Sequence, residues 1–362
     1  MKSIEHLFCK SLMEMVPYSP IEPPDQIAKR LGLDEQQIIK LDANENPYGT
    51  SPEIMSALAN VQYYHIYPDP AQVQLREAIA EYAGFQPENI IAGTGADEII
   101  DIVCRLLLEP NDEVLSFVPT FSYYAHVIAL NKGRYLEIPR ESDFSISLET
   151  VNQLDLSRCK LVILCSPNNP SGNLLPGEVL QYFLQKDLIV MLDEAYYEFS
   201  SRTFASEILN HGNLIVLRTF SKCFAMAGLR VGYGIGATKL ISTLMKIKPP
   251  FSVNIAAEVA LKTCLNNLPS YSQQVEEIKK TREWSLQQLR RFDQLQVYPS
   301  ESNFILCRLK NADAAQLTRQ LERSGILIRY FATDRLKDCI RISVGTLEQM
   351  RTLVERLGEI LS

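Results

Sequence analysis

RTFSKCFAMAGLRVGYGIG fills residues 218–236 and decides how the rest of the chain is interpreted. The apolar run Leu214–Leu217 directly before it is typical of a buried strand, so Thr219, Ser221 and Lys222 come just after the carboxyl end of that strand. Open α/β sheets bind their ligands at this edge. We therefore expect an α/β fold with a ligand site around these side chains.

The side chains of this stretch suit a ligand that carries both an aldehyde and a phosphate. A free lysine amine has a pKa of roughly 10.4, but burial and a second cation such as Arg230 lower that pKa and leave a nucleophile toward carbonyls, as in Schiff-base chemistry. Arg230 presents a fixed fork of donors suited to phosphate, and the hydroxyls of Thr219 and Ser221 can donate to the same group. The alternative, a surface Ser-Lys pair before a glycine-rich turn, is disfavoured by the motifs below.

The composition favours a two-domain enzyme that acts on small molecules. The chain has 362 residues, more than one hydrophobic core usually serves, although a single large domain is an alternative. Its net charge of -7, with no block of lysine or arginine, argues against nucleic acid or an anionic membrane as a partner. The eight cysteines form no C-x-x-C pair, and no segment approaches the length needed to span a bilayer. We therefore expect a cytoplasmic protein with reduced thiols.

Hydrophobic periodicity predicts a mostly parallel sheet covered by helices on both faces. The strand-like runs are 89–92, 113–118, 135–138, 161–165, 188–192 and 214–217. The helical patterns between them are 93–108, 122–130 and 176–185. Alternation of strand and helix implies parallel pairing. Before this region we expect helices at 1–15, 52–59 and 73–82 and a strand at 38–41.

The pattern changes after residue 250. Longer helices are expected there at 254–264, 271–292 and 347–360, with short strands at 303–309 and 326–328 and a further apolar strand around Arg341. We predict an N-terminal arm and part of a small domain in 1–44, a large cofactor-binding domain in 45–250 and the small C-terminal domain in 251–362.

Polar side chains mark three further strand ends. Asn169 follows one apolar strand, and Asp193 and Tyr196 follow the next, although an aspartate there could only cap a turn. The segment GTGADE, residues 93–98, opens a helix whose N-terminus could hold a phosphate. It is not a dinucleotide fingerprint, because Glu98 stands where the third glycine belongs.

Together these motifs resemble those of the fold-type I aminotransferases, most closely the histidinol-phosphate aminotransferases of class II. The resemblance runs from Val16 to about Glu348, and its motifs stand in the family's order. It implies a large domain with a mostly parallel sheet covered by helices, plus a smaller α+β domain. It also implies pyridoxal 5'-phosphate as the cofactor.

The resemblance assigns roles to individual residues. The implied cofactor contacts are Gly95, Ala96, Asp97, Phe121, Asn169, Asp193, Tyr196, Thr219, Ser221, Lys222, Arg230 and Tyr67. Lys222, Asp193 and Tyr196 would be the catalytic residues. Lys222 would hold the cofactor and shuttle the α-proton, while Asp193 would keep the pyridine nitrogen protonated. Asn169 and Tyr196 would hydrogen-bond the phenolic oxygen of the ring, and Phe121 would stack on it, where many relatives carry tyrosine.

The resemblance also implies a substrate site and a homodimer. The implied substrate-binding residues are Tyr18, Asn46, Arg329 and Arg341. Arg341 lies between isoleucines and needs an anionic partner if it is buried, whereas the alternative is a surface ion pair on an edge strand. Tyr67 would reach the cofactor of the neighbouring subunit, whereas the alternative is an aromatic side chain packed on a turn.

The implied activity is transfer of the amino group of L-histidinol phosphate to 2-oxoglutarate, giving imidazole acetol phosphate and L-glutamate, in histidine biosynthesis. An aromatic amino-acid aminotransferase or a phospho-amino-acid decarboxylase of the same fold would need the same cofactor residues. A non-catalytic sensor would need a DNA-binding module, for which the length leaves no room. The four histidines lack metal-ligand spacing, and there is no G-x-S-x-G elbow or P-loop.

Overall fold

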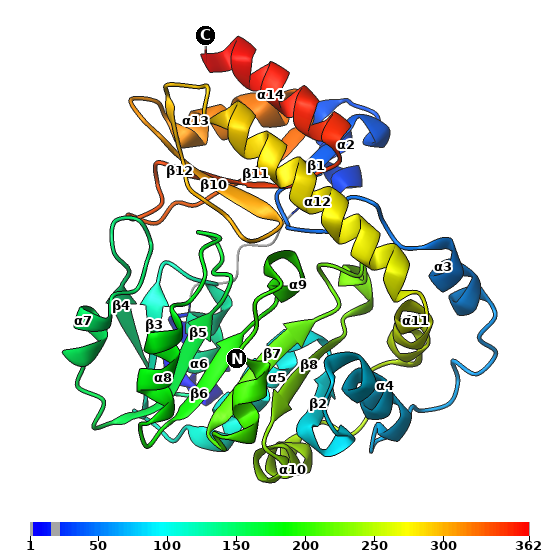
Figure 1. Ribbon diagram of the computed structural model, residues 1–362, viewed down its shortest axis with the longest axis vertical. Coiled ribbons are helices and arrows are strands. Elements are labelled where there is room, and N and C mark those ends of the chain that lie inside the picture. Colours follow the sequence, from blue (N-terminus) through cyan, green and yellow to red (C-terminus); the bar gives the residue numbers. More distant parts are fainter. Residues whose placement is uncertain (1–2, 16–21, 362) are drawn as a thin grey trace.

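The computed structural model describes residues 3–15 and 22–361, and within them the strands form two sheets (Figure 1). The larger sheet has the strand order β2-β8-β7-β6-β5-β3-β4. Its strands are β2 (Ile90–Gly93), β3 (Glu113–Val118), β4 (Arg134–Pro139), β5 (Cys159–Cys165), β6 (Ile189–Asp193), β7 (Leu214–Thr219) and β8 (Gly232–Gly236). The pairs are parallel except those of β8, which runs antiparallel to both neighbours. The predicted mostly parallel sheet is confirmed.

Helices cover both faces of the larger sheet because its strands are apolar on both sides. Along β6, Met191 packs into one core cluster while Val190 and Leu192 pack into another, as alternation along a strand requires. The Met191 face is covered by α5 (Gly95–Leu107), α6 (Tyr123–Leu130) and α10 (Thr238–Ile247). The opposite face is covered by α4 (Val73–Ala83), α8 (Gly177–Leu184) and α11 (Ile255–Leu265).

The smaller sheet lies above the larger one in Figure 1 and has the order β1-β11-β12-β10-β9. Its strands are β1 (Ile39–Leu41), β9 (Leu295–Val297), β10 (Phe304–Leu309), β11 (Ile326–Tyr330) and β12 (Cys339–Ser343). It packs with α2 (Pro24–Leu31), α12 (Leu268–Leu289), α13 (Ala314–Arg323) and α14 (Leu347–Leu361). Strand β1 pairs in parallel with β11, and the chain segment that follows β1 leads from the smaller sheet toward the larger one (Figure 1).

The remaining helices are short. They are α1 (Lys10–Met13), α3 (Pro52–Ala59), α7 (Leu148–Asn152) and α9 (Tyr197–Ser200), with 3-10 turns between some elements. None of the helices formed by the described residues is long and apolar enough to cross a bilayer.

Two expectations about local structure need correction. The predicted helix over residues 1–15 is wrong, because a 3-10 turn at Glu5–Leu7 and α1 are separated by extended backbone. Both pieces lack side-chain caps, and so short a helix needs tertiary packing, yet Ile4 and Leu7 are exposed. The stretch Gly232–Gly236 is a strand, β8, which the sequence did not predict because glycine weakens strands.

The glycines of β8 are explained by how closely α5 and β2 approach it. A side chain at Gly232 would place its Cβ 2.4 Å from the backbone nitrogen of Ala96, at the start of α5. At Gly234 the corresponding distance is 3.1 Å, to the Ile91 side chain. Because these glycines have no side chain, the N-terminus of α5 can pack against β8, the strand that follows Arg230.

Candidate active site

A cavity of about 550 Å³ lies between the two sheets, at the carboxyl ends of the parallel strands. Most of the residues predicted to form the site line it. They are Ala96, Asp97, Phe121, Asn169, Asp193, Tyr196, Thr219, Ser221, Lys222, Arg230, Arg329 and Arg341. Segments spread over more than two hundred positions of sequence thus contribute to one cavity, as expected for an open α/β sheet.

One end of the cavity gathers donors for an anion. Gly95 begins α5 at a φ of 76°, and a Cβ there would lie 2.7 Å from Arg230 Nη2. The Thr219 hydroxyl donates to Ser221 Oγ at 2.9 Å, and Arg230 Nη1 reaches the same oxygen at 3.5 Å. A helix N-terminus, two hydroxyls and a guanidinium form a site suited to a phosphate.

Asp193 ends β6 as a buried carboxylate that faces the cavity. Its Oδ2 accepts from the Tyr124 hydroxyl at 2.5 Å and its Oδ1 from the backbone N–H of Ala195 at 2.9 Å, so both donors are neutral. Burial raises the pKa of Asp193 to about 6 against these hydrogen bonds. A carboxylate held in this way is suited to a cationic N–H donor in a ligand.

Lys222 lies in the loop after β7, opposite these groups. Its Nζ donates to the backbone oxygen of Ala43 at 3.1 Å. Burial, and next the positive charge of Arg341, lower the pKa of Lys222 to about 8. The amine is therefore neutral in an appreciable fraction of molecules near neutral pH and can act as a nucleophile or base.

The hydroxyl of Tyr196 is bound by two amides. Asn44 Nδ2 donates to it at 3.0 Å and Asn169 Nδ2 at 3.4 Å. Burial raises the pKa of the Tyr196 phenol, so it remains protonated at neutral pH. The site therefore offers a neutral phenol beside the lysine.

Two arginines from the smaller sheet close the other side of the cavity. Arg329 and Arg341 are direct partners in the β11–β12 pairing. Arg341 donates to Asn169 Oδ1 at 2.7 Å and to the backbone oxygen of Asp42 at 2.6 Å, and its side chain is buried. Because β12 lies between β11 and β10, the alternative of a surface ion pair on an edge strand is wrong. Adjacent guanidinium groups in a cavity are suited to a carboxylate or a phosphate.

Three of the predicted residues that the structure describes, Gly95, Asn46 and Tyr67, are not among those that line the cavity of this chain. Asn46 is buried but turned away, since its Nδ2 donates to the backbone oxygen of Cys223 at 2.7 Å and to Gln274 at 3.0 Å. Tyr67 is 78% exposed and stacks on Phe251, with 4.7 Å between the ring centroids. Tyr18 lies outside the described residues.

Sequence reasoning missed two residues that the fold brings to the site. Asn44 lines the cavity and lies two residues before Asn46, which was the asparagine predicted to bind substrate. Tyr124 was counted only as part of a helical pattern, although a buried tyrosine hydroxyl needs a hydrogen-bond partner, which was an available signal.

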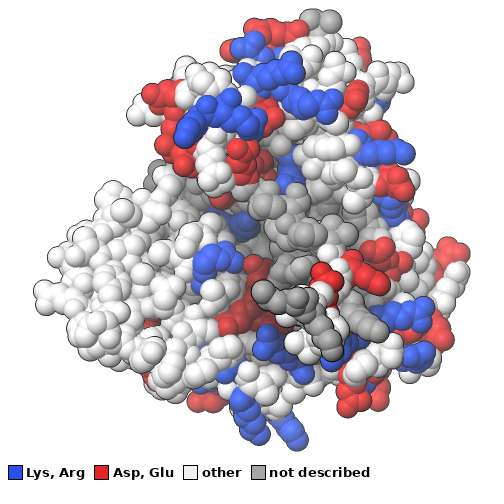
Figure 2. Space-filling model, turned by 180° about the vertical axis from the view of Figure 1, so that it is seen from behind, with Lys and Arg blue, Asp and Glu red and all other residues white. Residues whose placement is uncertain are grey.

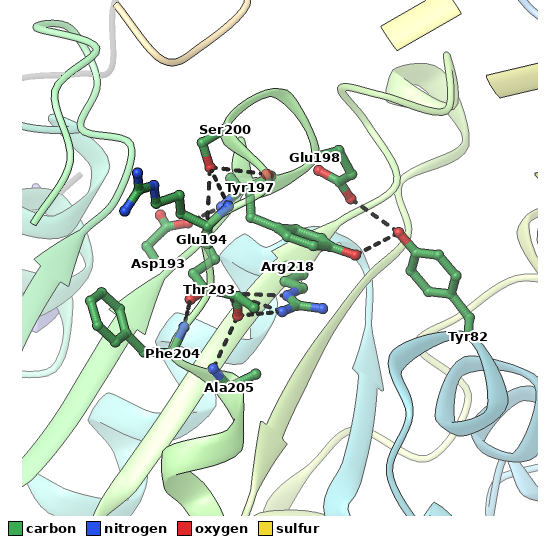
Figure 3. Close-up of polar contacts among 12 residues, drawn as sticks. Tyr82, Asp193, Glu194, Tyr197, Glu198, Ser200, Thr203, Phe204, Ala205 and Arg218 are labelled. Carbon is green, nitrogen blue, oxygen red and sulfur yellow. Dashed lines mark hydrogen bonds and ion pairs between the residues drawn. The ribbon is translucent and has the colours of Figure 1, made fainter. Parts of the chain in front are cut away.

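A second polar cluster lies beneath the end of β6 and is drawn in Figure 3. Glu194 accepts from Arg218 Nη2 at 3.0 Å and from the Thr203 hydroxyl at 2.7 Å. The Arg218 guanidinium stacks over the Tyr197 ring at 3.6 Å, and Tyr197 in turn shares a hydrogen bond of 2.7 Å with Tyr82. This cluster anchors the short helix α9, which follows Tyr196.

The family model for aminotransferase class I and II matches residues 36–357. The chain belongs to this aminotransferase family. Among curated aminotransferases, histidinol-phosphate aminotransferase of Roseiflexus castenholzii is 41% identical, with 99% of each chain covered. The chloroplastic histidinol-phosphate aminotransferase of Nicotiana plumbaginifolia is also 41% identical, over 96% of this chain and 84% of that protein.

A solved aminotransferase structure agrees with the fold. Histidinol-phosphate aminotransferase of Sinorhizobium meliloti, in complex with pyridoxal-5'-phosphate, superposes with a TM-score of 0.87 at 25% identity. The alignment covers 98% of this chain and 97% of that one. The predicted fold type is thereby confirmed.

Proposed function

We propose that this aminotransferase uses pyridoxal phosphate to transfer the amino group of L-histidinol phosphate to 2-oxoglutarate, giving imidazole acetol phosphate and L-glutamate in histidine biosynthesis. The observation that carries the proposal is the partly buried lysine with a lowered pKa, Lys222, which faces the cavity together with the buried carboxylate of Asp193. The names of relatives about 40% identical over nearly the whole chain support the choice of substrate.

The residues present fit this cofactor. Glycine at 232 and at 95 lets the N-terminus of α5 approach both β8 and Arg230, which forms a cradle for a phosphate. Among the described residues, Asp193 accepts only from neutral donors, so a protonated pyridine nitrogen would supply the missing positive charge. Phe121 lines the cavity and would stack on the ring.

When bound, pyridoxal phosphate supplies an aldehyde that combines with amines and a ring that withdraws electrons from the carbon bearing the amino group. Lys222 would bind that aldehyde through Nζ and would be released when the substrate amine takes its place. Its freed amine would then take the proton from this carbon and return it elsewhere. Asp193 would hold a proton on the ring nitrogen, which strengthens the electron withdrawal. Tyr196 and Asn169 would hold the phenolic oxygen.

Arg341 and Arg329 would recognise the anionic group of each substrate, together with Tyr18. Glutamate offers a carboxylate where histidinol phosphate offers a phosphate dianion, so the same site must accept both in alternate half-reactions. A second cation favours the dianion, since a charge-assisted hydrogen bond contributes roughly 1.5 to 3 kcal/mol. Arg329→Ala should therefore lower kcat/KM for histidinol phosphate more than for glutamate, whereas Arg341→Ala should lower both. Equal losses in Arg329→Ala would remove that residue from phosphate recognition.

A homodimer is the assembly we propose, with Tyr67 reaching the cofactor phosphate of the partner subunit. The side of the molecule that carries α3, α4 and α11, on the right in Figure 1 and on the left in Figure 2, presents a broad area free of charged residues. Large apolar side chains are exposed in α3, in the connection between α3 and α4, at the start of α4 and shortly before α11: Met55, Tyr63, Tyr64, Ile66, Tyr67, Val73 and Phe251. So large an apolar surface is typical of an interface.

Mixing chains tests the dimer directly. Tyr67→Ala and Lys222→Ala should each be inactive, yet hybrid dimers would contain one site free of both changes and recover part of the activity. No recovery, despite proven subunit exchange, would contradict a shared site.

Two further proposals follow from the same observations. The chain is expected to work in the cytoplasm, in keeping with buried cysteines that form no disulfide among the described residues. In the proposed division into residues 1–44, 45–250 and 251–362, the placement of 1–44 with the small domain is supported by β1, which pairs with the C-terminal sheet, whereas α11 packs with α3 and α4 of the large domain.

A panel of amino donors with 2-oxoglutarate is the experiment that tests the proposed function. Histidinol phosphate should give the highest kcat/KM, measured as glutamate formed. Preference for phenylalanine or tyrosine would indicate an aromatic aminotransferase, and release of carbon dioxide from a phosphorylated amino acid would indicate a decarboxylase.

A further inference from the structure

Asn44 lies in a short connection that crosses the site between the two sheets. Three consecutive carbonyls of this connection accept hydrogen bonds: Asp42 from Arg341 at 2.6 Å, Ala43 from Lys222 at 3.1 Å and Asn44 from Asn303 at 3.0 Å. Asn44 itself is 1% exposed and has a φ of 55°, a conformation that asparagine and aspartate tolerate better than most residues. Its side chain is therefore held in one place.

The orientation of the Asn44 amide is fixed by Ser343 on β12. The backbone N–H of Asn44 can only donate, and it donates to Ser343 Oγ at 2.8 Å. The Ser343 hydroxyl, already an acceptor, uses its own proton to donate to Asn44 Oδ1 at 3.0 Å. Asn44 Nδ2 must then point the other way, where it donates to the Tyr196 hydroxyl.

The same reasoning fixes the second amide at Tyr196. Arg341 can only donate, so Asn169 Oδ1 is the atom that faces it, and Asn169 Nδ2 faces Tyr196. Among the described residues, the hydrogen bonds of the Tyr196 oxygen are those it accepts from these two amides. Its single O–H proton is thus left to donate to a ligand in the cavity, which Tyr196 lines.

We propose that Asn44 is a positioning residue that directs the Tyr196 hydroxyl proton into the cavity, toward the phenolic oxygen of the bound cofactor. The proposal rests on the proposed function only in that the cofactor is pyridoxal phosphate. Ser343, two residues beyond Arg341 on the same strand, sets this direction from the smaller sheet. The proton that polarises the cofactor is therefore aimed by a chain of hydrogen bonds that begins outside the larger sheet.

In the low-pH form of the bound cofactor, the phenolic oxygen shares a proton. A hydrogen bond donated to this oxygen by Tyr196 weakens its hold on that proton. It therefore lowers the pH at which the visible absorbance of the holoprotein changes. Asn44→Asp keeps the shape of the side chain and suits the same φ, and its Oδ1 still accepts from Ser343. The other oxygen cannot donate, so the Tyr196 proton turns toward it and away from the cofactor.

The experiment is a pH titration of the visible absorbance of purified holoprotein without substrate. Asn44→Asp should raise the midpoint by about one pH unit or more, the size expected for loss of a charge-assisted hydrogen bond. Tyr196→Phe should raise it similarly. Because a new negative charge alone would also raise the midpoint, the deciding comparison is Asn44→Asp in the Tyr196→Phe background, where only this effect of the charge remains and we expect a clearly smaller shift than in the wild-type background.

Two serine variants give a second test should the aspartate variant fold poorly. Ser343→Ala frees the Asn44 amide to turn and should raise the midpoint by a smaller amount. Ser302→Ala is the matched control, since Ser302 is equally buried and, among the described residues, its Oγ has no hydrogen-bond partner, so the midpoint should not move.

The outcomes separate this inference from the proposed function. A wild-type protein that binds no cofactor would overturn the proposed function. A wild-type midpoint that is unchanged in Asn44→Asp and in Ser343→Ala, or a full additional shift in the Tyr196→Phe background, would overturn the role of Asn44 alone. A merely structural role would lower the melting temperature without moving the midpoint.

Discussion

Two consecutive carboxylates at the end of β6, Asp193 and Glu194, show how one fold treats the same chemical group in opposite ways. Both are buried, with 5% and 1% of their surface exposed. The charge of Glu194 is balanced within the chain by Arg218, which donates to it from Nε and Nη2. Glu194 also accepts from the Thr203 hydroxyl and the backbone N–H of Phe204 (Figure 3). Within the described part of the chain, Asp193 accepts only from Tyr124 and the backbone N–H of Ala195, and it faces the cavity. A buried carboxylate that is paired with a cation of the protein serves the structure. A buried carboxylate that accepts from neutral donors can still pair with a cationic group of a ligand.

The largest expected effect follows from removing the charge of Asp193. Asp193→Asn should lower kcat by several powers of ten, each about 1.4 kcal/mol of transition-state stabilisation, while the protein still folds and binds cofactor. The apoprotein should be no less stable, because the variant removes a buried charge for which residues 3–15 and 22–361 supply no cationic partner. Rate measurements are to be paired with thermal unfolding of the apoprotein. A variant that simply unfolds would favour the turn-capping role.

Breaking the ion pair between Glu194 and Arg218 should instead reduce the stability of the protein. Arg218→Met leaves Glu194 buried without its cation and should reduce the free energy of unfolding by about 3 to 5 kcal/mol. Denaturant unfolding of the apoprotein measures this loss. The control is Arg218→Met combined with Glu194→Gln, which removes both charges and should restore much of the stability. If the double variant were as unstable as the single one, packing of the Arg218 side chain and not its charge would explain the loss.

Glu198 is a third carboxylate of this region, and its substitution is expected to have the smallest effect of the three. Its Oε1 accepts from Tyr82 at 3.5 Å, and its Oε2 has no hydrogen-bond partner among the described residues. Burial raises the pKa of Glu198 to about 8. The folded protein therefore binds a proton that the unfolded chain releases above about pH 4.3, so stability due to this group is present in acid and is lost as the pH rises through 8.

Glu198→Gln should remove that pH dependence. The melting temperature of the apoprotein should exceed that of the wild type by a few degrees at pH 9 and match it at pH 4. Melting curves of the two proteins across this range measure the difference. An equal offset at both pH values would show that the effect is one of packing and not of ionisation.

The regular part of the fold was predictable because its signals are local. The strands β5, β6 and β7 are continuous apolar runs, and the polar residues that follow them fall at the cavity as expected. The strand β8 was missed because its glycines are explained only by the contact with α5, which is distant in sequence. The helices α10 and α13 and the strand β9 were also not predicted.

Within the site, only the residues that belong to a sequence motif could be predicted from the sequence. The direction of each polar side chain depends on partners far along the chain, as with Asn44, which contacts Tyr196 and Ser343. For that reason Asn46 could not be distinguished from Asn44. The roles assigned to the site residues, those of Arg329, Tyr67 and Tyr18 included, stay predictions.

The central claim is that the chemistry of the cavity takes place on Lys222. Reduction of the holoprotein with borohydride, followed by digestion and mass spectrometry, locates the lysine that carries the cofactor. Lys248 is an internal comparison, because it is buried and burial lowers its pKa, as it does for Lys222, but its amine donates to Pro249 and Ser252. The account predicts that the cofactor mass is found on the peptide containing Lys222 and is absent from Lys222→Ala. Its presence on Lys248 or another lysine, or wild-type activity in Lys222→Ala, would contradict the account.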